Sequence, residues 1–227
     1  MGKVFILMGP PGCGKGTQTA NIVEELGLPH IDTGSLLRKN VKEGTEFGLE
    51  AKSYMDKGQL VPIQVVANII KDRLQADDCK NGYVLDGFPR NLEQAKALEG
   101  IQADLDYGFE NVAIYFDIPT SILVERLVNR RYCPECGAIY NLLSRKPKEE
   151  GICDICKNEI LQRNDDNEET AKLRFETYEN ETAPLLGYFE EKGILNKVDA
   201  NKRMNEVWDQ IKEIIAWLQE KIEKKLN

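Results

Sequence analysis

The chain has 227 residues, of which 41% are hydrophobic and 30% are charged, and its formal net charge is −8. A chain of this size can bury a core without disulfides, so its six cysteines point first to metal binding or catalysis. The acidic balance disfavours nucleic acid as a partner, because a polyanion attracts basic surfaces. No apolar run is long enough to span a membrane, and the short apolar N-terminal stretch lacks the length of a signal peptide. We therefore expect a cytoplasmic protein that binds neither a membrane nor nucleic acid.

The chain alternates between buried-strand and helix patterns. Residues 4–8 form a continuous apolar run that ends at a glycine loop, which predicts a buried parallel strand. Further strands are expected at residues 83–87, 112–117 and 195–198, and helices at 15–26, 62–74, 92–98 and 122–128. An apolar stripe predicts a C-terminal helix that covers the core; its members are Val207, Ile211, Ile214, Leu218 and Ile222. Strands that alternate with helices predict an α/β fold, a parallel sheet with helices on both faces.

Two insertions interrupt this alternation. Residues 32–61 are expected to form short helices separated by Gly44 and Gly58. Residues 129–166 contain four cysteines and few core-sized apolar residues, so this segment needs another cross-link to hold it together. We therefore divide the chain into a core domain (1–31, 62–128 and 167–227), a first insertion (32–61) and a second insertion (129–166).

The glycine loop from Gly9 to Thr17 follows the first strand and opens a helix. Backbone N–H groups of such a loop, together with the helix N-terminus, bind phosphate oxygens, and Lys15 can reach the terminal phosphates. The pattern predicts a P-loop. In the usual P-loop a serine or threonine follows the lysine, whereas here Gly16 intervenes, so it stays open which hydroxyl approaches magnesium. Asp86 closes another strand at the edge where ligands of parallel sheets bind, and it fits a Mg²⁺ anchor acting through water; a helix cap is the alternative.

Four cysteines form two CxxC pairs, Cys133 with Cys136 and Cys153 with Cys156, separated by residues 137–152. This spacing is typical of a four-cysteine zinc site, in which the protein fills all four positions and the metal is structural. Four free thiols or a redox pair are less favoured interpretations. Cys13 and Cys79 stand apart and are not expected to be ligands.

Four motifs spread over nearly the whole chain resemble the signature set of the adenylate kinase family. They are Gly12-Cys13-Gly14-Lys15-Gly16-Thr17-Gln18, Asp32-Thr33-Gly34 followed by Leu37-Arg38, Asp86-Gly87-Phe88-Pro89-Arg90, and Arg163 with Asp165-Asp166. The resemblance implies a P-loop NTPase-type fold with a helical AMP-binding insertion and a zinc-binding lid. It also implies reversible transfer of the terminal phosphoryl group of ATP to AMP with Mg²⁺, giving two ADP, a role in adenine nucleotide homeostasis, and a monomer.

Carried over position by position, the resemblance implies three groups of site residues. The ATP site comprises Gly12, Cys13, Gly14, Lys15, Gly16, Thr17, Arg126, Arg130, Ile139, Tyr140 and Lys202. The AMP site comprises Thr33, Gly34, Arg38, Gln59, Leu60, Val61, Gly87, Phe88, Pro89, Arg90, Gln94, Arg163 and Arg174. The catalytic cations are Lys15, Arg90, Arg126, Arg130, Arg163 and Arg174. Because phosphoryl transfer needs positioning and cations more than a base, the single histidine, His30, is expected to be structural.

Two alternatives stay open. A related kinase could act on UMP or CMP, but such kinases tend to carry Ala where this chain has Thr33 and Asn where it has Gln94. A zinc-ribbon, nucleic-acid-binding NTPase is opposed by the acidic balance and by the absence of an aromatic and basic stripe around the cysteines. One departure from the family pattern is Ser35-Leu36-Leu37, where many members have Asp-Met-Leu or Asp-Met-Phe.

Overall fold

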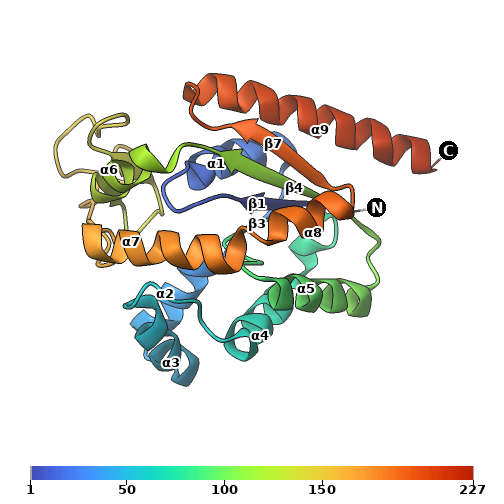
Figure 1. Cartoon of the computed structure of the whole chain (residues 1–227), viewed down its shortest axis with the longest axis horizontal. Helices are drawn as coiled ribbons and strands as arrows, with labels where there is room; N and C mark the ends of the chain where they lie inside the picture. The colour runs from blue at the N-terminus through green and yellow to red at the C-terminus, as the bar shows by residue number, and fades with distance from the viewer. Residues whose placement is uncertain (1, 227) are drawn as a thin grey trace.

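A computed structural model describes residues 2–226, and within this range a parallel sheet of five strands forms the centre of the molecule (Figure 1). The strands stand in the order β2-β3-β1-β4-β7, with β1 (Gly2–Met8) between β3 (Gly82–Asp86) and β4 (Phe109–Asp117). The outer strands are β2 (His30–Asp32) and β7 (Leu195–Asp199). All neighbouring pairs are parallel, so the carboxyl ends of the strands meet at one edge. The predicted α/β fold is confirmed.

Helices cover both faces of the sheet. α1 (Lys15–Leu26) and α9 (Met204–Leu226) lie on one face, and α4 (Ile63–Leu74), α5 (Leu92–Leu105) and α8 (Leu185–Glu191) lie on the other (Figure 1). The side chains of β1 alternate between the two cores: Val4, Ile6 and Met8 enter one, while Phe5 and Leu7 enter the other. This period of two, with apolar residues on both faces, is why the strand appears in the sequence as an uninterrupted apolar run.

Two further helices, α6 (Leu123–Val128) and α7 (Glu168–Thr177), flank the second insertion, and short helical turns occupy Asp77–Cys79, Thr120–Ile122 and Tyr178–Thr182. The predicted helix at 15–26 has the observed bounds, whereas the one at 92–98 continues to Leu105. The predicted C-terminal stripe needs one correction. Ile215 is 5% exposed and fills the core, while Ile214 is only partly buried against it. From the sequence we expect His30 at the end of the second strand, but it opens β2 and is exposed.

The first insertion contains α2 (Thr33–Glu43) and α3 (Glu46–Met55). Gly44 ends α2 in the left-handed conformation (φ 67°), and the Thr45 hydroxyl caps α3 by accepting from the Gly48 N–H at 3.0 Å. At Gly48 a Cβ would come within 2.2 Å of the Asn40 carbonyl oxygen. The two helices therefore pack backbone against backbone, which compensates for the few apolar side chains of this segment.

The second insertion carries a two-stranded antiparallel ribbon, β5 (Arg130–Tyr132) and β6 (Ile139–Asn141). Its small core consists of Cys133, Tyr140, Cys153 and Ile160. Two of these four are cysteines, which fits the expectation that apolar packing alone does not hold this segment together.

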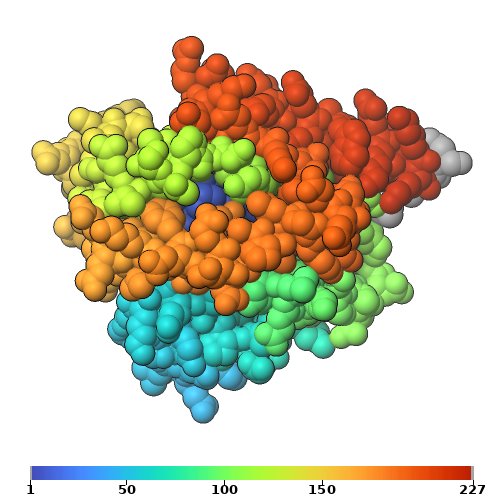
Figure 2. All heavy atoms as spheres, viewed as in Figure 1, coloured from blue at the N-terminus to red at the C-terminus, as the bar shows by residue number. Residues whose placement is uncertain are grey.

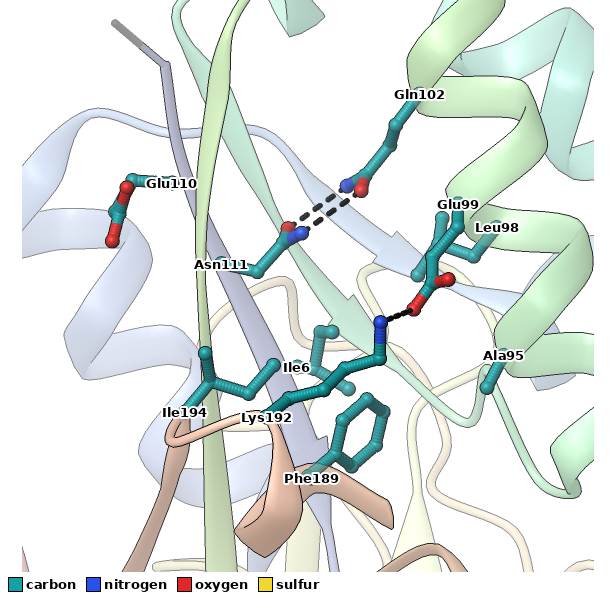
Figure 3. Close-up of a pocket in the computed structure, with 10 residues that line it drawn as sticks. All are labelled: Ile6, Ala95, Leu98, Glu99, Gln102, Glu110, Asn111, Phe189, Lys192 and Ile194. Atoms are coloured by element: carbon teal, nitrogen blue, oxygen red, sulfur yellow. Dashed lines mark hydrogen bonds and ion pairs between the residues drawn. The ribbon is translucent and has the colours of Figure 1, made fainter.

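A hollow of about 320 Å³ lies between α5, the beginning of β4 and α8, near the amino ends of the strands (Figure 3). The amides of Gln102 and Asn111 form two reciprocal hydrogen bonds of 2.9 Å, and Lys192 donates to Glu99 at 2.8 Å (Figure 3). Glu110 is paired in turn with two lysines of α9. Each ionisable or amide side chain that lines this hollow thus already has a protein partner, so it braces the fold and is not the functional site. Among the described residues, none of the helices has both the length and the apolar composition of a membrane span.

Candidate active site

The glycine loop joins β1 to α1 at the carboxyl edge of the sheet. Gly12 (φ 83°) and Gly14 (φ 101°) have positive φ values that side chains other than glycine rarely adopt. This path directs the first N–H groups of α1, which have no partners within the helix, into the loop. The Lys15 ammonium bends back over the loop and donates to the carbonyl oxygens of Gly9 at 2.6 Å and Pro10 at 3.2 Å. In Figure 2, atoms of the N-terminal part of the chain (blue) are visible through an opening, which lies between α7 on one side and the segment around α6 on the other.

Two carboxylates end neighbouring strands beside this loop. Asp32 and Asp86 are register partners in the last pair of β2 and β3. Burial raises the pKa of Asp86, and the nearby Lys15 ammonium partly offsets this. A Cβ on Gly16 would lie 4.0 Å from the Asp86 carboxylate, so that carboxylate faces the loop. An oxygen donor next to the phosphate-binding loop fits a hydrated magnesium ion.

Asp32 also organises the start of the first insertion. Its carboxylate caps α2 by accepting from the Gly34 N–H at 2.9 Å, and it pairs with Arg38 at 3.4 Å. Ser35 donates to Asp32 and accepts from Arg38 at 2.9 Å. Although burial by itself raises the pKa of Asp32, Arg38 and the Ser35 hydroxyl together hold it below its usual value. The departure at Ser35 thus adds a hydroxyl that links the carboxylate to the guanidinium.

Thr33 carries a buried hydroxyl without a protein partner in the described part of the chain. The residue is 3% exposed, and an unsatisfied buried hydroxyl is costly unless a ligand or water completes it. On the other side of the first insertion, Val61 is buried, and the Gln59 N–H donates to the Tyr54 carbonyl at 3.0 Å.

The loop after β3 presents Arg90. Gly87 leaves the strand with φ 82°, and the Phe88–Pro89 peptide bond is cis. The Arg90 side chain folds over this loop, with its Nε donating to the Gly87 carbonyl at 2.9 Å. Its backbone N–H donates to the side-chain oxygen of Gln94 at 2.8 Å. Gln94 is buried, at 3% exposure, and its side-chain oxygen already accepts this hydrogen bond from Arg90.

Four more arginines come from the second insertion, which we call the lid, and from the helices α6 and α7 that flank it. Arg130, at the start of β5, forms a two-point ion pair with the fully buried Asp166. Arg174 pairs with Asp165 at 2.7 Å and with Asp166 at 3.4 Å. The acidic pair therefore holds two of the arginines in place. Arg126, in the last turn of α6, is half-buried, and Lys202 is exposed beside Asp199 at 4.0 Å.

Arg163 is the least satisfied member of this group. Its guanidinium lies 5.3 Å from the centre of the Tyr132 ring, and its buried Nε has no hydrogen-bond partner within residues 2–226. Burial, followed by repulsion from Arg130 and Arg38, lowers the pKa of Arg163 to about 9. Burial likewise lowers the pKa of Arg174 to about 10, with Arg130 contributing. Cations of the lid and of the first insertion thus converge on one space, which suits an anion with several oxygens.

The four lid cysteines lie together, with their sulfur atoms all within 4.8 Å of one another. In each knuckle the residue after the second cysteine is left-handed, Gly137 at φ 74° and Lys157 at φ 64°. The N–H groups of these two residues donate to the carbonyls of Cys133 and Cys153, each at 3.0 Å. The two knuckles therefore repeat one geometry, and four thiolates at this spacing fit tetrahedral zinc. A glycine occupies the left-handed position of the first turn, whereas the second turn uses a lysine, so the sequence shows a turn signal only at Gly137.

Tyr140, expected near the base of ATP, has its side chain inside the lid. The residue is 3% exposed, and its hydroxyl accepts from the Asp154 N–H at 2.8 Å and lies 3.4 Å from the Cys153 sulfur. The phenol therefore supports the cysteine cluster, so Tyr140 has only its backbone to offer a nucleotide, whereas the Ile139 side chain is partly exposed.

A P-loop, a group of arginines gathered beside it and a cysteine-rich second insertion define the class of P-loop phosphotransferases. The adenylate kinase family model matches residues 7–194. The chain is 47% identical to an adenylate kinase of Clostridium perfringens, and 49% identical to adenylate kinases of Clostridium botulinum and Methanosarcina mazei. Each match covers 93% of this chain and 98% of the relative.

The chain belongs to the adenylate kinase family, and its reaction is ATP + AMP ⇌ 2 ADP. The predicted enzyme class is confirmed. The match favours the adenylate type over both alternatives, the pyrimidine nucleotide kinase and the nucleic-acid-binding NTPase.

Proposed function

We propose that ATP phosphates bind the P-loop residues 12–17 and that AMP binds between the first insertion and the Gly87–Arg90 loop. The observation that carries this proposal is the convergence of Lys15, Arg38 and Arg163 on the carboxyl edge of the sheet, with Arg163 close enough to Arg38 for their charges to repel. On ATP binding, the Lys15 ammonium exchanges its two carbonyl partners for phosphate oxygens. Arg126, Arg130, the β6 backbone and Lys202 complete the donor site.

For the acceptor, Arg38 and Arg90 hold the phosphate of AMP. A planar guanidinium can donate two parallel hydrogen bonds to a phosphate, which a lysine does poorly. The unsatisfied Thr33 hydroxyl, the Gln94 amide and the backbone at Gln59, Leu60 and Val61 surround the nucleoside. Gln94 thus has two tasks, reading the base and holding the Arg90 backbone.

Transfer itself depends on positive charge around the moving phosphoryl group. Arg163 and Arg174 contribute guanidinium groups whose pKa values are lowered first by burial and then by repulsion from neighbouring arginines, and they remain protonated at neutral pH. An incoming phosphoryl group relieves that repulsion, so these arginines interact most strongly as negative charge accumulates in the transition state. Asp86 holds Mg²⁺ through water, and this ion neutralises phosphate charge when bound.

Cys133, Cys136, Cys153 and Cys156 hold one structural Zn²⁺. The four cysteines fill all four coordination positions of the metal, so no position is open for substrate. The metal therefore contributes folding free energy to the lid. These roles correspond to the division of the chain: residues 32–61 close over AMP, residues 129–166 close over ATP, and the remaining residues form the core domain. We further propose a monomer that maintains adenine nucleotide balance in the cytoplasm.

The test is a coupled assay with AMP, CMP, UMP and GMP as acceptors and ATP with Mg²⁺ as donor. AMP is expected to give the highest kcat/KM. A higher value for CMP or UMP would place the chain with the pyrimidine nucleotide kinases. Filter binding with RNA and DNA is expected to detect no complex.

A further inference from the structure

The turn that connects α7 to α8 has an unusual backbone. Residues Tyr178–Thr182 form a π-helical turn, closed by a hydrogen bond of 2.8 Å from the Ala183 N–H to the Tyr178 carbonyl. Tyr178 and Thr182 are buried at 7% and 8% exposure, while the three residues between them are exposed. Such turns are rare and often occur at functional positions. The wide turn directs the Thr182 side chain towards the interior.

The Thr182 hydroxyl donates to the carbonyl oxygen of Arg90 at 2.7 Å, across 92 residues of chain. Arg90 immediately precedes Asn91, the N-cap of α5, so its carbonyl lies outside the hydrogen-bond ladder of that helix. A buried carbonyl needs a partner, and the threonine hydroxyl supplies one.

Three hydrogen bonds thus hold Arg90, and their partners lie in different parts of the chain. Its N–H bonds Gln94 and its Nε bonds the Gly87 carbonyl, and both partners belong to the same loop and helix. These two contacts fix the shape of the loop but move with it. Thr182 is different, because it connects Arg90 to the segment that continues α7, the helix that carries Arg174.

We propose that Thr182 is a positioning residue for phosphoryl transfer, which fixes the Arg90 loop relative to Arg174 and α7. The inference rests on the proposed acceptor role of Arg90. Two guanidinium groups that grip one reacting phosphate must keep their separation, and a misplacement of about 1 Å can reduce the rate by roughly 100-fold. A hydroxyl that bonds the Arg90 backbone controls this separation without touching the substrate.

The experiment replaces Thr182 by Val, which keeps the shape and removes the hydroxyl donor. We expect kcat/KM for AMP to fall by about 5- to 50-fold, while KM for ATP stays within about twofold of the wild-type value. Thr182→Ser should restore most of the activity, because the donor is retained. If Val is poorly tolerated, Thr182→Ala compared with Thr182→Ser isolates the same hydroxyl.

Thr177→Val is the control for a neighbouring threonine hydroxyl that does not contact the Arg90 loop: it bonds the Leu173 carbonyl at 2.9 Å and the Gly58 carbonyl at 3.3 Å. An equal loss in this control would assign the effect to the segment as a whole and overturn the inference. A Thr182→Val enzyme with unchanged kinetics would also overturn the inference. An equal rise of KM for ATP and for AMP would overturn it as well.

A double substitution separates this inference from the proposed acceptor site. If Thr182 acts through Arg90, adding Thr182→Val to Arg90→Ala should reduce kcat/KM little further, whereas independent effects would multiply. An inactive Arg90→Ala enzyme beside a normal Thr182→Val enzyme would reject the role of Thr182 alone. If Arg90→Ala left AMP kinetics unchanged, the acceptor site itself would be wrong.

Discussion

Arg130 donates its Nε to Asp166 at 2.8 Å as one half of a two-point ion pair, and the Asp166 carboxylate is completely buried. Asp166 also receives Arg174 at 3.4 Å, so one buried carboxylate organises arginines from the lid and from α7. The arrangement explains how several like charges are held close together before any phosphate arrives. A buried charge with two cationic partners depends on both for compensation.

Asp166→Asn keeps the shape of this side chain and removes its charge. We expect the free energy of unfolding to fall by about 3 kcal/mol, because buried arginines lose their counter-ion. The activity should fall as well, since Arg130 and Arg174 lose their orientation. Denaturant unfolding and steady-state kinetics measure the two effects, with Asp209→Asn on the exposed face of α9 as the control. A stable, fully active variant would show that Asp166 does not organise the arginines.

Lys15→Ala should remove most of the phosphotransfer while the fold stays intact. The ammonium stabilises charge on the transferring phosphates, and the loss of such a group costs on the order of 3 kcal/mol or more of transition-state stabilisation. We expect kcat to fall by at least about 100-fold with an unchanged melting temperature. Lys172→Ala, an exposed substitution on α7, controls for charge. If Lys15→Ala kept more than half of the wild-type kcat, the donor assignment would fail.

Tyr140→Phe tests the link between β6 and the zinc site. The phenol oxygen accepts from the Asp154 N–H, so its own hydrogen is available to the Cys153 sulfur at 3.4 Å. Hydrogen bonds to metal ligands typically change metal affinity by about 10- to 100-fold, and we expect zinc to be released to a chelator correspondingly more readily. Zinc competition and metal analysis measure this, with one zinc per chain expected in the wild type. Tyr188→Phe, which removes the hydroxyl that bonds Glu99, is the control; equal release from both variants would contradict the link.

Glu110→Gln tests how α9 is fastened to the sheet. Burial alone raises the pKa of Glu110, but Lys221 and Lys225 together hold this pKa below its usual value of 4.5. A carboxyl group with a lowered folded-state pKa stabilises the fold above its unfolded-state value and loses that contribution as pH falls through the folded-state value. The free energy of unfolding of the wild type should therefore exceed that of Glu110→Gln by about 1 kcal/mol at pH 7. The difference should shrink as pH falls below 4.5 and vanish once the pH is below the lowered folded-state pKa of Glu110.

Urea unfolding at several pH values provides these free energies, and Glu190→Gln, an exposed change on α8, provides the baseline. A difference that persisted at low pH would mean that the carboxylate charge is not what fastens α9.

Local signals made part of this molecule predictable. The bounds of α1 follow from Gly14 before it and Gly27 after it, both left-handed, and the cysteine spacing predicts the four-cysteine cluster directly. Which of two adjacent isoleucines is buried is harder to predict, because a helix turns only about 100° per residue. The burial of Ile214 or Ile215 depends on what packs against α9.

Other features depend on contacts that no local pattern encodes. The bond from Thr182 to Arg90 joins segments 92 residues apart, and the π-turn that makes it possible has no apolar period of its own. The inward direction of the Tyr140 side chain likewise depends on the second knuckle, which lies further along the chain. Motif resemblance supplies the proposed site residues, whereas the tertiary structure is needed to identify the contacts that support them.

The kinetics of Arg38→Ala test the assignment of the two nucleotide sites most directly, because Arg38 belongs to the proposed acceptor side alone. KM for AMP should rise by about tenfold or more, as a charge-assisted bond to phosphate is lost, while KM for ATP stays nearly constant. Lys39→Ala, its exposed neighbour, should behave like the wild type. A rise in KM for ATP with no change for AMP would contradict the assignment of the two nucleotide sites.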